Sequence, residues 1–167
     1  PISKTISTSF GADYFYTKYN ENAAQFDSGY QSNIFAAFSE TDLLVTNNLI
    51  AKVGFRFSKN NLLNENSVSP RLALAYKVAK NKQISMAYGN FDQTPKREYL
   101  VFTNPLQTEK AQHYILNYEY AKDRQIFKAE VYYKKYNNLV KYDTQMPLYN
   151  SNFNNDGTGY AKGLELF

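Results

Sequence analysis

The sequence predicts an all-β protein of eight antiparallel strands, and three observations support this fold class. Apolar and polar residues alternate with a period of two along eight segments, as in strands with one face against an apolar environment. Turns and polar loops separate these segments, and none of them shows the 3.6-residue period of an amphipathic helix, so no helix is expected. Tyr and Phe together make up 17% of the 167 residues, an aromatic content too high for a disordered chain.

Four strands are predicted in the first half of the chain. They span residues 3–17, 30–40, 47–58 and 69–79. The strand at 3–17 alternates clearly, except that Phe15 falls among the polar side chains. The strand at 30–40 is less regular, and we expect Ile34, Ala36 and Phe38 to form its apolar face.

Four more strands are predicted in the second half, where the alternation is clearest. They span residues 83–92, 109–121, 125–137 and 159–167. In the strand at 125–137, Phe127, Val131 and Tyr133 face one side while Lys128 and Glu130 face the other. The last strand places Leu164 and Leu166 opposite Gly163 and Glu165.

The predicted connections alternate in length. Three are tight, at residues 41–46, 79–82 and 121–124, and four are long and polar, at 18–29, 58–69, 92–108 and 137–158. Because each strand reverses direction, all tight turns fall at one end of the sheet and all long loops at the other. An outer-membrane β-barrel has this asymmetry, with short periplasmic turns and longer extracellular loops, whereas a soluble sandwich has no need of it.

The apolar face carries tyrosines near the strand ends, which favours a membrane barrel. Tyrosine has an apolar body and a polar tip, so it suits the headgroup level of a bilayer. Most segments also reach the roughly 9–11 residues that a tilted membrane strand needs. The residues predicted to form two membrane girdles are Tyr14, Tyr16, Tyr76, Tyr88, Tyr114, Tyr118, Tyr120 and Tyr133. A soluble β-sandwich or lipocalin-like barrel is the alternative, because its binary pattern is the same.

The polar face mixes charged and amide residues with glycine, serine and alanine. The glycines at 11, 54, 89 and 163 suit the close approach of another object, such as a plug. Charged residues of both signs share this face, so charge ladders are expected rather than acid–base catalysis. The candidates for a lumen-facing or plug-facing role are Lys52, Arg56, Arg71, Lys77, Asn117, Glu119, Lys128, Glu130 and Glu165.

Composition excludes several functional classes. The absence of cysteine excludes disulfides and thiolate metal sites, and a mean hydropathy of −0.58 without a long apolar run excludes a transmembrane helix. The net charge of +4 is dispersed, so no nucleic-acid partner is predicted. His113 is the only histidine, which argues against a metal site, and the asparagine-rich stretch 150–159 is interpreted as an extracellular loop rather than a calcium site. No catalytic or phosphate-binding motif occurs, so neither an enzyme nor a cofactor is predicted.

The loop at residues 94–105 is the strongest candidate for ligand binding. Arg97, Tyr99 and Phe102 are predicted to stand at the extracellular mouth, where cation–π and stacking contacts to a ligand are available. The alternative is that Tyr99 and Phe102 only pack the loop against the protein.

Several segments resemble consecutive barrel strands of TonB-dependent outer-membrane receptors, in particular those of Bacteroidota. The segments are S-P-R-L-A-L-A-Y-K-V (69–78), Q-I-S-M-A-Y-G (83–89), L-Q-T-E-K-A-Q-H-Y (106–114), F-K-A-E-V-Y-Y-K-K-Y-N-N-L-V (127–140) and G-Y-A-K-G-L-E-L-F (159–167). Earlier in the chain, N-I-F-A-A-F-S-E (33–40) and A-K-V-G-F-R-F (51–57) agree less distinctively. The resemblance implies that residues 1–167 are an internal part of a single β-barrel domain, a transmembrane wall of 22 strands, with the plug domain outside this stretch.

The resemblance also implies a function and a set of partners. A receptor of this family sits in the bacterial outer membrane, binds a scarce ligand at its extracellular loops and imports it past the plug with energy from the TonB complex. The ligand is expected to be an iron chelate, cobalamin, a glycan or a peptide, and a surface lipoprotein lid is a further expected partner. A small eight-stranded membrane barrel with a structural or adhesive role, and a soluble ligand-binding barrel, are the alternatives.

Overall fold

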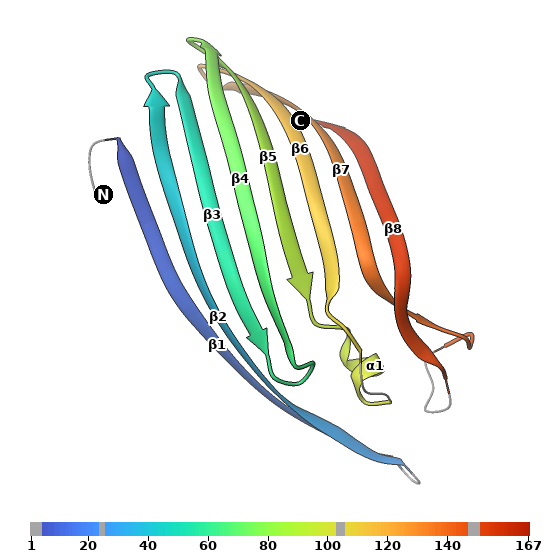
Figure 1. The fold of residues 1–167 in the computed structure, drawn as a ribbon. Helices are drawn as coiled ribbons and strands as arrows, with labels where there is room; N and C mark the ends of the chain where they lie inside the picture. Colours follow the sequence, from blue (N-terminus) through green and yellow to red (C-terminus); the bar gives the residue numbers. More distant parts are fainter. Residues whose placement is uncertain (1–4, 24–25, 103–105, 147–150) are drawn as a thin grey trace.

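The computed structural model describes residues 5–23, 26–102, 106–146 and 151–167, which form one curved antiparallel sheet (Figure 1). Its eight strands follow one another in chain order, each paired with the next. Their bounds are β1 Ile6–Ala23, β2 Phe26–Thr46, β3 Leu49–Asn60, β4 Glu65–Ala79, β5 Lys82–Gln93, β6 Glu109–Lys122, β7 Gln125–Tyr142 and β8 Phe153–Leu166. The fold class is therefore the predicted one, all-β with eight antiparallel strands in a single sheet.

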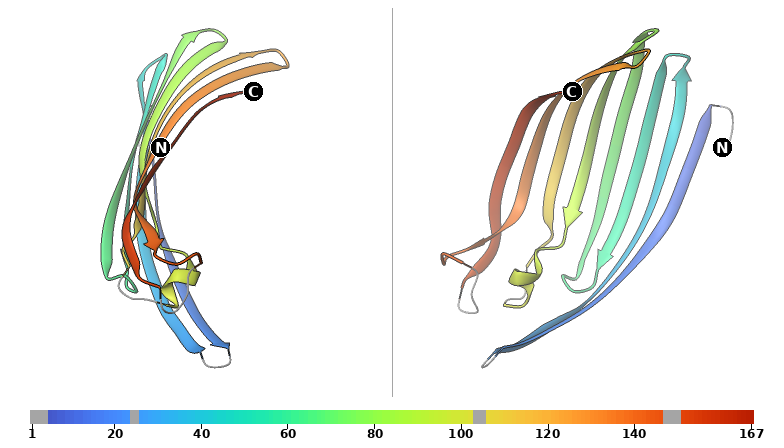
Figure 2. Two further views of the ribbon diagram at one scale, coloured as in Figure 1. Left: turned by 90° about the vertical axis from the view of Figure 1, so that its right-hand side faces the viewer. Right: turned by 180° about the vertical axis from the view of Figure 1, so that it is seen from behind.

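The sheet does not close on itself, because β1 and β8 are its two edges (Figures 1 and 2). A small barrel of eight strands requires these two strands to pair with each other. The described residues therefore do not form the closed eight-stranded barrel that was the alternative to a larger wall.

The two ends of the sheet differ in their connections. At one end, which we call the turn end, residues 47–48, 80–81 and 123–124 join successive strands. At the other, which we call the loop end, the connections are residues 24–25, 61–64, 94–108 and 143–152. The long connections thus all lie at the loop end, as predicted, but only two of the four loop-end connections are long.

The predictions of long loops at 18–29 and 58–69 are wrong. β1 and β2 stay paired as far as Ala23 and Phe26, and β3 and β4 stay paired as far as Asn60 and Glu65. The predicted tight turn at 41–46 also belongs to β2, and the turn follows at residues 47–48. The polar residues that suggested loops lie in strands that continue beyond the apolar zone, where both faces of a strand tolerate polar side chains.

The expectation that the chain holds no helix is also wrong, because the connection from β5 to β6 contains the short helix α1, Arg97–Leu100. This helix has one turn, too short for its sequence to show a 3.6-residue period. It lies on the concave side of the sheet at the loop end (Figure 2). No helix in the described part of the chain is long and apolar enough to cross a membrane.

Strand pairing assigns every side chain to one of two faces, because residues opposite each other in neighbouring strands lie on the same side. Tyr88, Tyr114 and Tyr133 share one face with the aliphatic side chains of β3 to β8, and this face is convex. Arg71 and His113 share the opposite face, which is concave and toward which the β5–β6 connection folds (Figure 2).

The predicted faces of the second strand are reversed. Phe35 pairs with Tyr14 on the convex side, while Ile34 pairs with Phe15 on the concave side. Residues 34–38 contain apolar side chains at every position, so alternation alone assigns no face there. The pairing with β1 and β3 decides that Ile34, Ala36 and Phe38 lie on the concave face.

The sheet has almost no buried core of its own. In the described part of the chain, the buried apolar residues are Ala36, Ala51, Leu100, Val101 and Leu106, and three of these lie in the β5–β6 connection. The convex face instead exposes large apolar side chains, including Phe10 (84% exposed), Phe55 (55%) and Leu164 (64%). A face this apolar needs a nonaqueous surrounding or another protein layer.

The glycines of the concave face are covered by side chains of the same sheet. The ring of Phe38 lies 2.7 Å from where a Cβ of Gly11 would stand, and Tyr132 covers Gly163 in the same way at 2.6 Å. Both rings come from the residue directly opposite in the neighbouring strand. The expectation that these two glycines leave room for a plug is therefore wrong, because the sheet itself fills the space.

Candidate functional site

The candidate functional site is the concave face together with the connection that folds over it at the loop end. All nine residues predicted to face a lumen or plug lie on this concave face. They are Lys52, Arg56, Arg71, Lys77, Asn117, Glu119, Lys128, Glu130 and Glu165. The pairing brings them onto one surface, while their contact with a plug stays a prediction.

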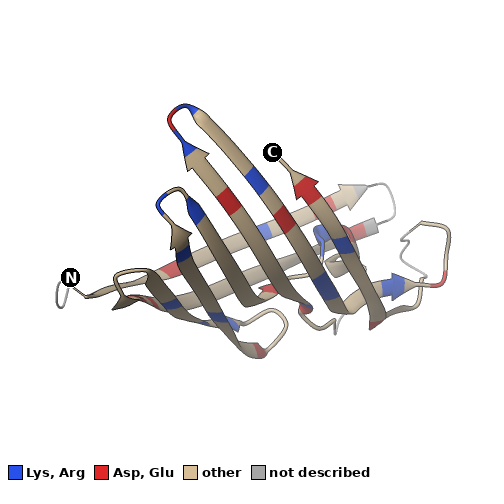
Figure 3. Cartoon of the chain, turned by 90° about the horizontal axis from the view of Figure 1, so that it is seen from above, with Lys and Arg blue, Asp and Glu red and all other residues tan. Residues whose placement is uncertain are grey.

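Ion pairs cross the concave face from strand to strand, and charges of both signs follow the strands (Figure 3). Arg56 reaches Asp13 at 2.9 Å, and Lys128 reaches Glu119 at 3.1 Å. A longer contact joins the Lys52 ammonium to the Asp42 carboxylate at 3.5 Å. The side chains in these pairs are at least 30% exposed, so each pair contributes at most about 1 kcal/mol. Their effect is to fix side-chain positions on the wall.

Gly54 allows one ion pair to span a whole strand. Glu40, Gly54 and Arg71 lie opposite one another on β2, β3 and β4, and the carboxylate of Glu40 reaches the guanidinium of Arg71 at 3.9 Å. Because Gly54 has no side chain, the Glu40 side chain lies directly over it. Arg71 also stacks on the ring of Phe91, with its Cζ 4.9 Å from the ring centroid.

A second group of concave-face residues is acidic. Asn117, Glu130 and Glu165 lie opposite one another on β6, β7 and β8. Within the described part of the chain, no cation lies within 4.0 Å of either carboxylate, and the side-chain oxygen of Asn117 accepts no hydrogen bond. Lys77 lies on the same face at the turn end, opposite Gln83.

His113 packs against an aromatic ring on the concave face. Its ring centroid is 4.6 Å from that of Phe91. Among the described residues, no group of three or more His, Cys, Asp or Glu side chains is placed to hold a metal ion.

The predicted ligand-contacting residues lie at the loop end, where two of them pack against rings from other strands. Tyr99 lies 5.8 Å from Tyr142 and 6.0 Å from Phe153, measured between ring centroids. Phe102 stacks on Phe153 at 6.4 Å. Burial raises the pKa of the Tyr99 phenol, and the neighbouring carboxylate of Glu98 adds to the rise, so this hydroxyl is neutral at physiological pH.

Arg97 differs from these two aromatic residues because its guanidinium stays exposed. Its Cζ lies 4.5 Å from the ring centroid of Tyr19, which the extended end of β1 carries out to this position. The guanidinium thus lies against an aromatic face, and the residue is exposed to solvent. Among the three predicted ligand contacts, Arg97 is therefore the one available to an anionic group.

Polar contacts that the sequence did not reveal tie the β5–β6 connection to the wall. Glu65 accepts hydrogen bonds from the backbone nitrogen of Thr108 at 2.9 Å and from its hydroxyl. The amide of Asn60 donates to the hydroxyl of Thr94 at 2.9 Å, and Ser28 donates to the carbonyl oxygen of Val101 at 2.6 Å. Glu65, Asn60 and Ser28 were assigned to loops, so no pattern pointed to them.

The eight predicted girdle tyrosines all lie on the convex face. Their exposed fractions include 66% for Tyr14, 50% for Tyr76 and 45% for Tyr114. Tyr160, which was not predicted, joins them by stacking on Tyr133 with ring centroids 6.1 Å apart. A girdle role for these residues stays a prediction.

A curved antiparallel sheet that is apolar on its convex face and polar on its concave face has the construction of an outer-membrane barrel wall. Comparison with known proteins identifies the family: residues 3–167 match the model described as TonB dependent receptor-like, beta-barrel. The chain belongs to this family, whose members are transporters rather than enzymes, and its location is the bacterial outer membrane.

Solved structures show the same fold at low sequence identity. The siderophore receptor PirA from Pseudomonas aeruginosa aligns with a TM-score of 0.81 and 15% identity over 96% of this chain and 32% of that one. The ferric enterobactin receptor PfeA from the same organism aligns with a TM-score of 0.81 and 13% identity over 96% of this chain and 30% of that one. The copper transporter OprC gives 0.73 and 12% over 98% and 32%. The chain thus spans about a third of each of these proteins, and no curated protein matches it.

Proposed function

We propose that these residues form eight consecutive strands of a 22-stranded, plugged barrel in a receptor that imports a scarce ligand with TonB-supplied energy. The observation that carries this proposal is the open sheet, apolar on its convex face and polar on its concave face, in a chain of the TonB-dependent receptor family. In hydrocarbon, unpaired backbone groups at a sheet edge cost several kcal/mol each. Further strands of the receptor therefore pair with β1 and β8, and the plug occupies the space on the concave side.

The ligand in this proposal is an anionic metal chelate. Three solved relatives by fold carry the names of a siderophore receptor, a ferric enterobactin receptor and a copper transporter. At the loop end of this chain, Arg97 offers an exposed guanidinium beside aromatic rings, which suits a ligand with negative charge and unsaturated groups. Cobalamin, a glycan and a peptide are the competing classes. The TonB complex is reached through segments outside these residues, and a surface lipoprotein lid is a further proposed partner.

The replacement Arg97→Ala in the full-length receptor tests the role of the loop end. We expect ligand binding to weaken about fivefold, corresponding to roughly 1 kcal/mol for a lost cation contact at an exposed site. The matched control is Lys96→Ala, which removes a neighbouring exposed cation whose ammonium lies 3.8 Å from the Glu98 carboxylate. Binding and uptake are measured in cells with radiolabelled ferric siderophores, cobalamin, an oligosaccharide and a peptide in parallel.

Each outcome bears on a different part of the proposal. Equal affinities for Arg97→Ala and the native receptor would contradict a ligand contact at Arg97. Binding of cobalamin, glycan or peptide without any siderophore would contradict the anionic chelate. Uptake that persists after deletion of the TonB gene would contradict TonB-driven import.

A further inference from the structure

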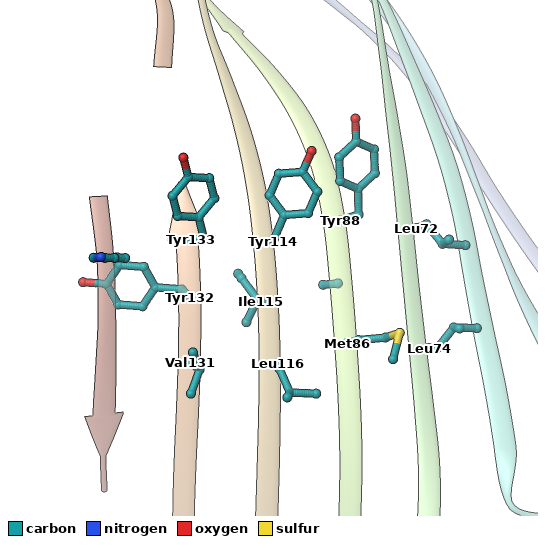
Figure 4. A pocket seen from close by; sticks show the side chains of 12 residues that line it. Leu72, Leu74, Met86, Tyr88, Tyr114, Ile115, Leu116, Val131, Tyr132 and Tyr133 are labelled. Carbon is teal, nitrogen blue, oxygen red and sulfur yellow. The ribbon is translucent and has the colours of Figure 1, made fainter. Parts of the chain in front are cut away.

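The two faces of the wall differ in shape as well as in polarity. On the convex face, Leu74, Met86 and Leu116 form part of a broad apolar surface (Figure 4). On the concave face, β3 to β6 carry a groove that runs from the middle of the wall to the turn end. The groove consists of three adjoining hollows, with volumes of about 210, 330 and 380 Å³ in that order.

The three hollows form one groove because they share lining residues. Ala73 and Ala87 line both the first hollow and the second. Ile50 and Ala75 line both the second hollow and the third. On β5, Ser85 lies opposite Ala75 and also lines the second hollow. Short side chains thus leave the floor of the groove open along its length.

The cations of the first two hollows have acidic partners. The Lys52 ammonium, which lines both hollows, lies 3.5 Å from the Asp42 carboxylate. The Arg71 guanidinium lines the first hollow and lies 3.9 Å from the carboxylate of Glu40. These two hollows therefore carry little net charge.

The last hollow, at the turn end, carries unpaired positive charge. Lys77, Lys80 and Lys82 line it, and all three are exposed. In the part of the chain that the structure describes, none of them has a carboxylate within 4.0 Å. The carboxylate of Glu119 also lines the hollow, but the Lys128 ammonium lies 3.1 Å away and compensates its charge. Like charges around one hollow repel one another, and an anion among them relieves that repulsion.

The neighbouring turn adds to this positive potential. Between β6 and β7, Lys122 and Arg124 stand beside a single acidic residue, Asp123. A surface on which one sign of charge dominates attracts ions of the opposite sign over about a Debye length, roughly 8–10 Å. The turn end therefore draws anions toward the last hollow.

Hydrogen bonds between neighbouring turns hold the backbone around the last hollow. The Lys77 nitrogen donates to the Asn48 carbonyl oxygen at 2.8 Å, and the Ala121 nitrogen donates to that of Asn81 at 3.0 Å. Asn48 and Asn81 also line the hollow, and their side-chain amides are donors that suit an anion. The lysines thus stand on a rim whose backbone is already ordered, which lowers the cost of binding.

We propose that the last hollow is an exit site, which binds the anionic chelate after it has passed the plug and before it is released. This inference rests on the proposed function, from which it takes the negative charge of the ligand and the direction of transport. The turn end faces the periplasm in barrels of this kind. The neutralised hollows offer the ligand a path without holding it, and the unpaired lysines attract it to the end of the groove.

Binding at the exit site is weak, as release requires. The three lysines are exposed, and water and salt screen the interactions of exposed charges. A tight site at this end would retain the ligand and slow its transport. A neutral ligand gains nothing from the lysines, so the exit site selects its ligand by charge.

Metal-free citrate serves as the probe, because it is a small polycarboxylate. The full-length receptor, with its plug, is purified in neutral detergent as the Arg97→Ala variant, so that the loop-end guanidinium contributes nothing. Citrate binding is measured by saturation-transfer NMR at low ionic strength. In this background we expect the dissociation constant to rise about fivefold in Lys77→Gln and about 30-fold in Lys77→Gln/Lys80→Gln. The matched control Lys134→Gln, which removes a concave-face cation outside the groove, leaves it unchanged.

Uptake by cells is the second readout, in a receptor that retains Arg97. For Lys77→Gln/Lys80→Gln we expect native affinity for a radiolabelled ferric siderophore at the cell surface, and a saturated uptake rate about fivefold lower. Failure of the proposed function appears elsewhere, as unchanged ligand binding in Arg97→Ala or as absent siderophore binding. Heat-modifiable gel migration confirms that each variant is folded, and Lys77→Gln alone provides the test if the double variant does not assemble.

Three results would overturn the exit site. The first is a citrate dissociation constant for Lys77→Gln equal to that of its Arg97→Ala parent. The second is an unchanged saturated uptake rate in Lys77→Gln/Lys80→Gln, because the hollow would then lie off the transport path. The third is a peptide with three carboxylates that binds about tenfold more tightly than citrate, since the hollow would then select a polypeptide.

Discussion

At the scale of single residues, glycines in this sheet differ in what stands over them. Gly157 lies at the irregular pairing between β7 and β8, and a Cβ there would clash with the carbonyl oxygen of Leu139. Two residues on, a Cβ at Gly159 would meet its nearest neighbour, Leu139 Cδ1, at 3.6 Å, an ordinary contact. A backbone carbonyl cannot rotate away as a side chain can, so of these two glycines Gly157 is the one that is sterically required.

Gly157→Ala is therefore expected to destabilise the receptor by about 1–3 kcal/mol, the usual cost of overpacking. The control Gly159→Ala is expected to change stability by less than about 0.5 kcal/mol. Urea unfolding of both full-length variants in detergent, followed by tryptic protection, measures the difference. Equal urea midpoints for Gly157→Ala and Gly159→Ala would contradict the steric requirement for glycine at position 157, because β7 and β8 would then accommodate the extra methyl group without loss of stability.

At the scale of elements, the β5–β6 connection contains most of the buried apolar side chains of the described chain. Leu100, Val101 and Leu106 are each at most 7% exposed, although the connection lies outside the strands. Glu65 holds its end through the backbone and hydroxyl of Thr108, and Asn60 holds its beginning through Thr94. The connection is thus anchored to the wall at both ends by polar groups from β3 and β4.

Glu65→Ala removes one of these anchors and is expected to loosen the connection. Hydrogen bonds to a charged acceptor contribute about 1.5–3 kcal/mol, so trypsin is expected to cleave after Lys96 or Arg97 at least about tenfold faster. The control is Glu98→Ala, because the Glu98 carboxylate contacts the exposed Lys96 at 3.8 Å. The prediction is checked by measuring the tryptic cleavage rates of the full-length variants by mass spectrometry. If Glu65→Ala is cut no faster than Glu98→Ala, the Glu65 contacts do not hold the connection.

At the scale of the whole molecule, the two faces of the sheet meet different surroundings. Leu116 on β6 is 49% exposed on the convex face, and the next residue, Asn117, lies on the concave face beside Glu130. A barrel wall in a bilayer places the first of these against lipid and the second in the lumen. A new positive charge is therefore expected to destabilise the receptor more at position 116 than at position 117.

Leu116→Arg is expected to destabilise the membrane-embedded receptor by about 2–4 kcal/mol, the cost of a cation on the lipid face near the midplane. Asn117→Arg is expected to be tolerated, because Glu130 and Glu165 lie on the same row and compensate the charge. The fraction of each full-length variant that shows heat-modifiable migration in outer-membrane preparations measures assembly. Equal assembly of the two variants would mean that the convex face does not contact lipid.

The strands and most of their faces were predictable from the sequence, whereas the strand ends were not. The alternation around Tyr133 or Leu72 reports which side chains avoid water, and this depends on each residue's own chemistry. Beyond the apolar zone, as at Tyr19 or Glu65, a strand has polar surroundings on both faces, and its sequence resembles that of a loop. Only the pairing with a neighbouring strand shows that the backbone stays extended there.

The candidate site was predictable in part for the same reason. Alternation placed all nine concave-face candidates on one surface, and the composition of the 94–105 loop pointed to Arg97. The residues that contact the β5–β6 connection include Tyr19, Ser28, Glu65 and Phe153. They are far away in sequence, and their contacts depend on how the strands curve and extend.

The sequence by itself therefore determined an antiparallel β-wall with one apolar and one polar face, because a period of two records the environment of each side chain. The tertiary structure decided the phase of β2, the length of β1, the open edges and the inward fold of the β5–β6 connection. These features depend on backbone hydrogen bonds and contacts between distant residues, and such pairings leave no periodic signal in the chain.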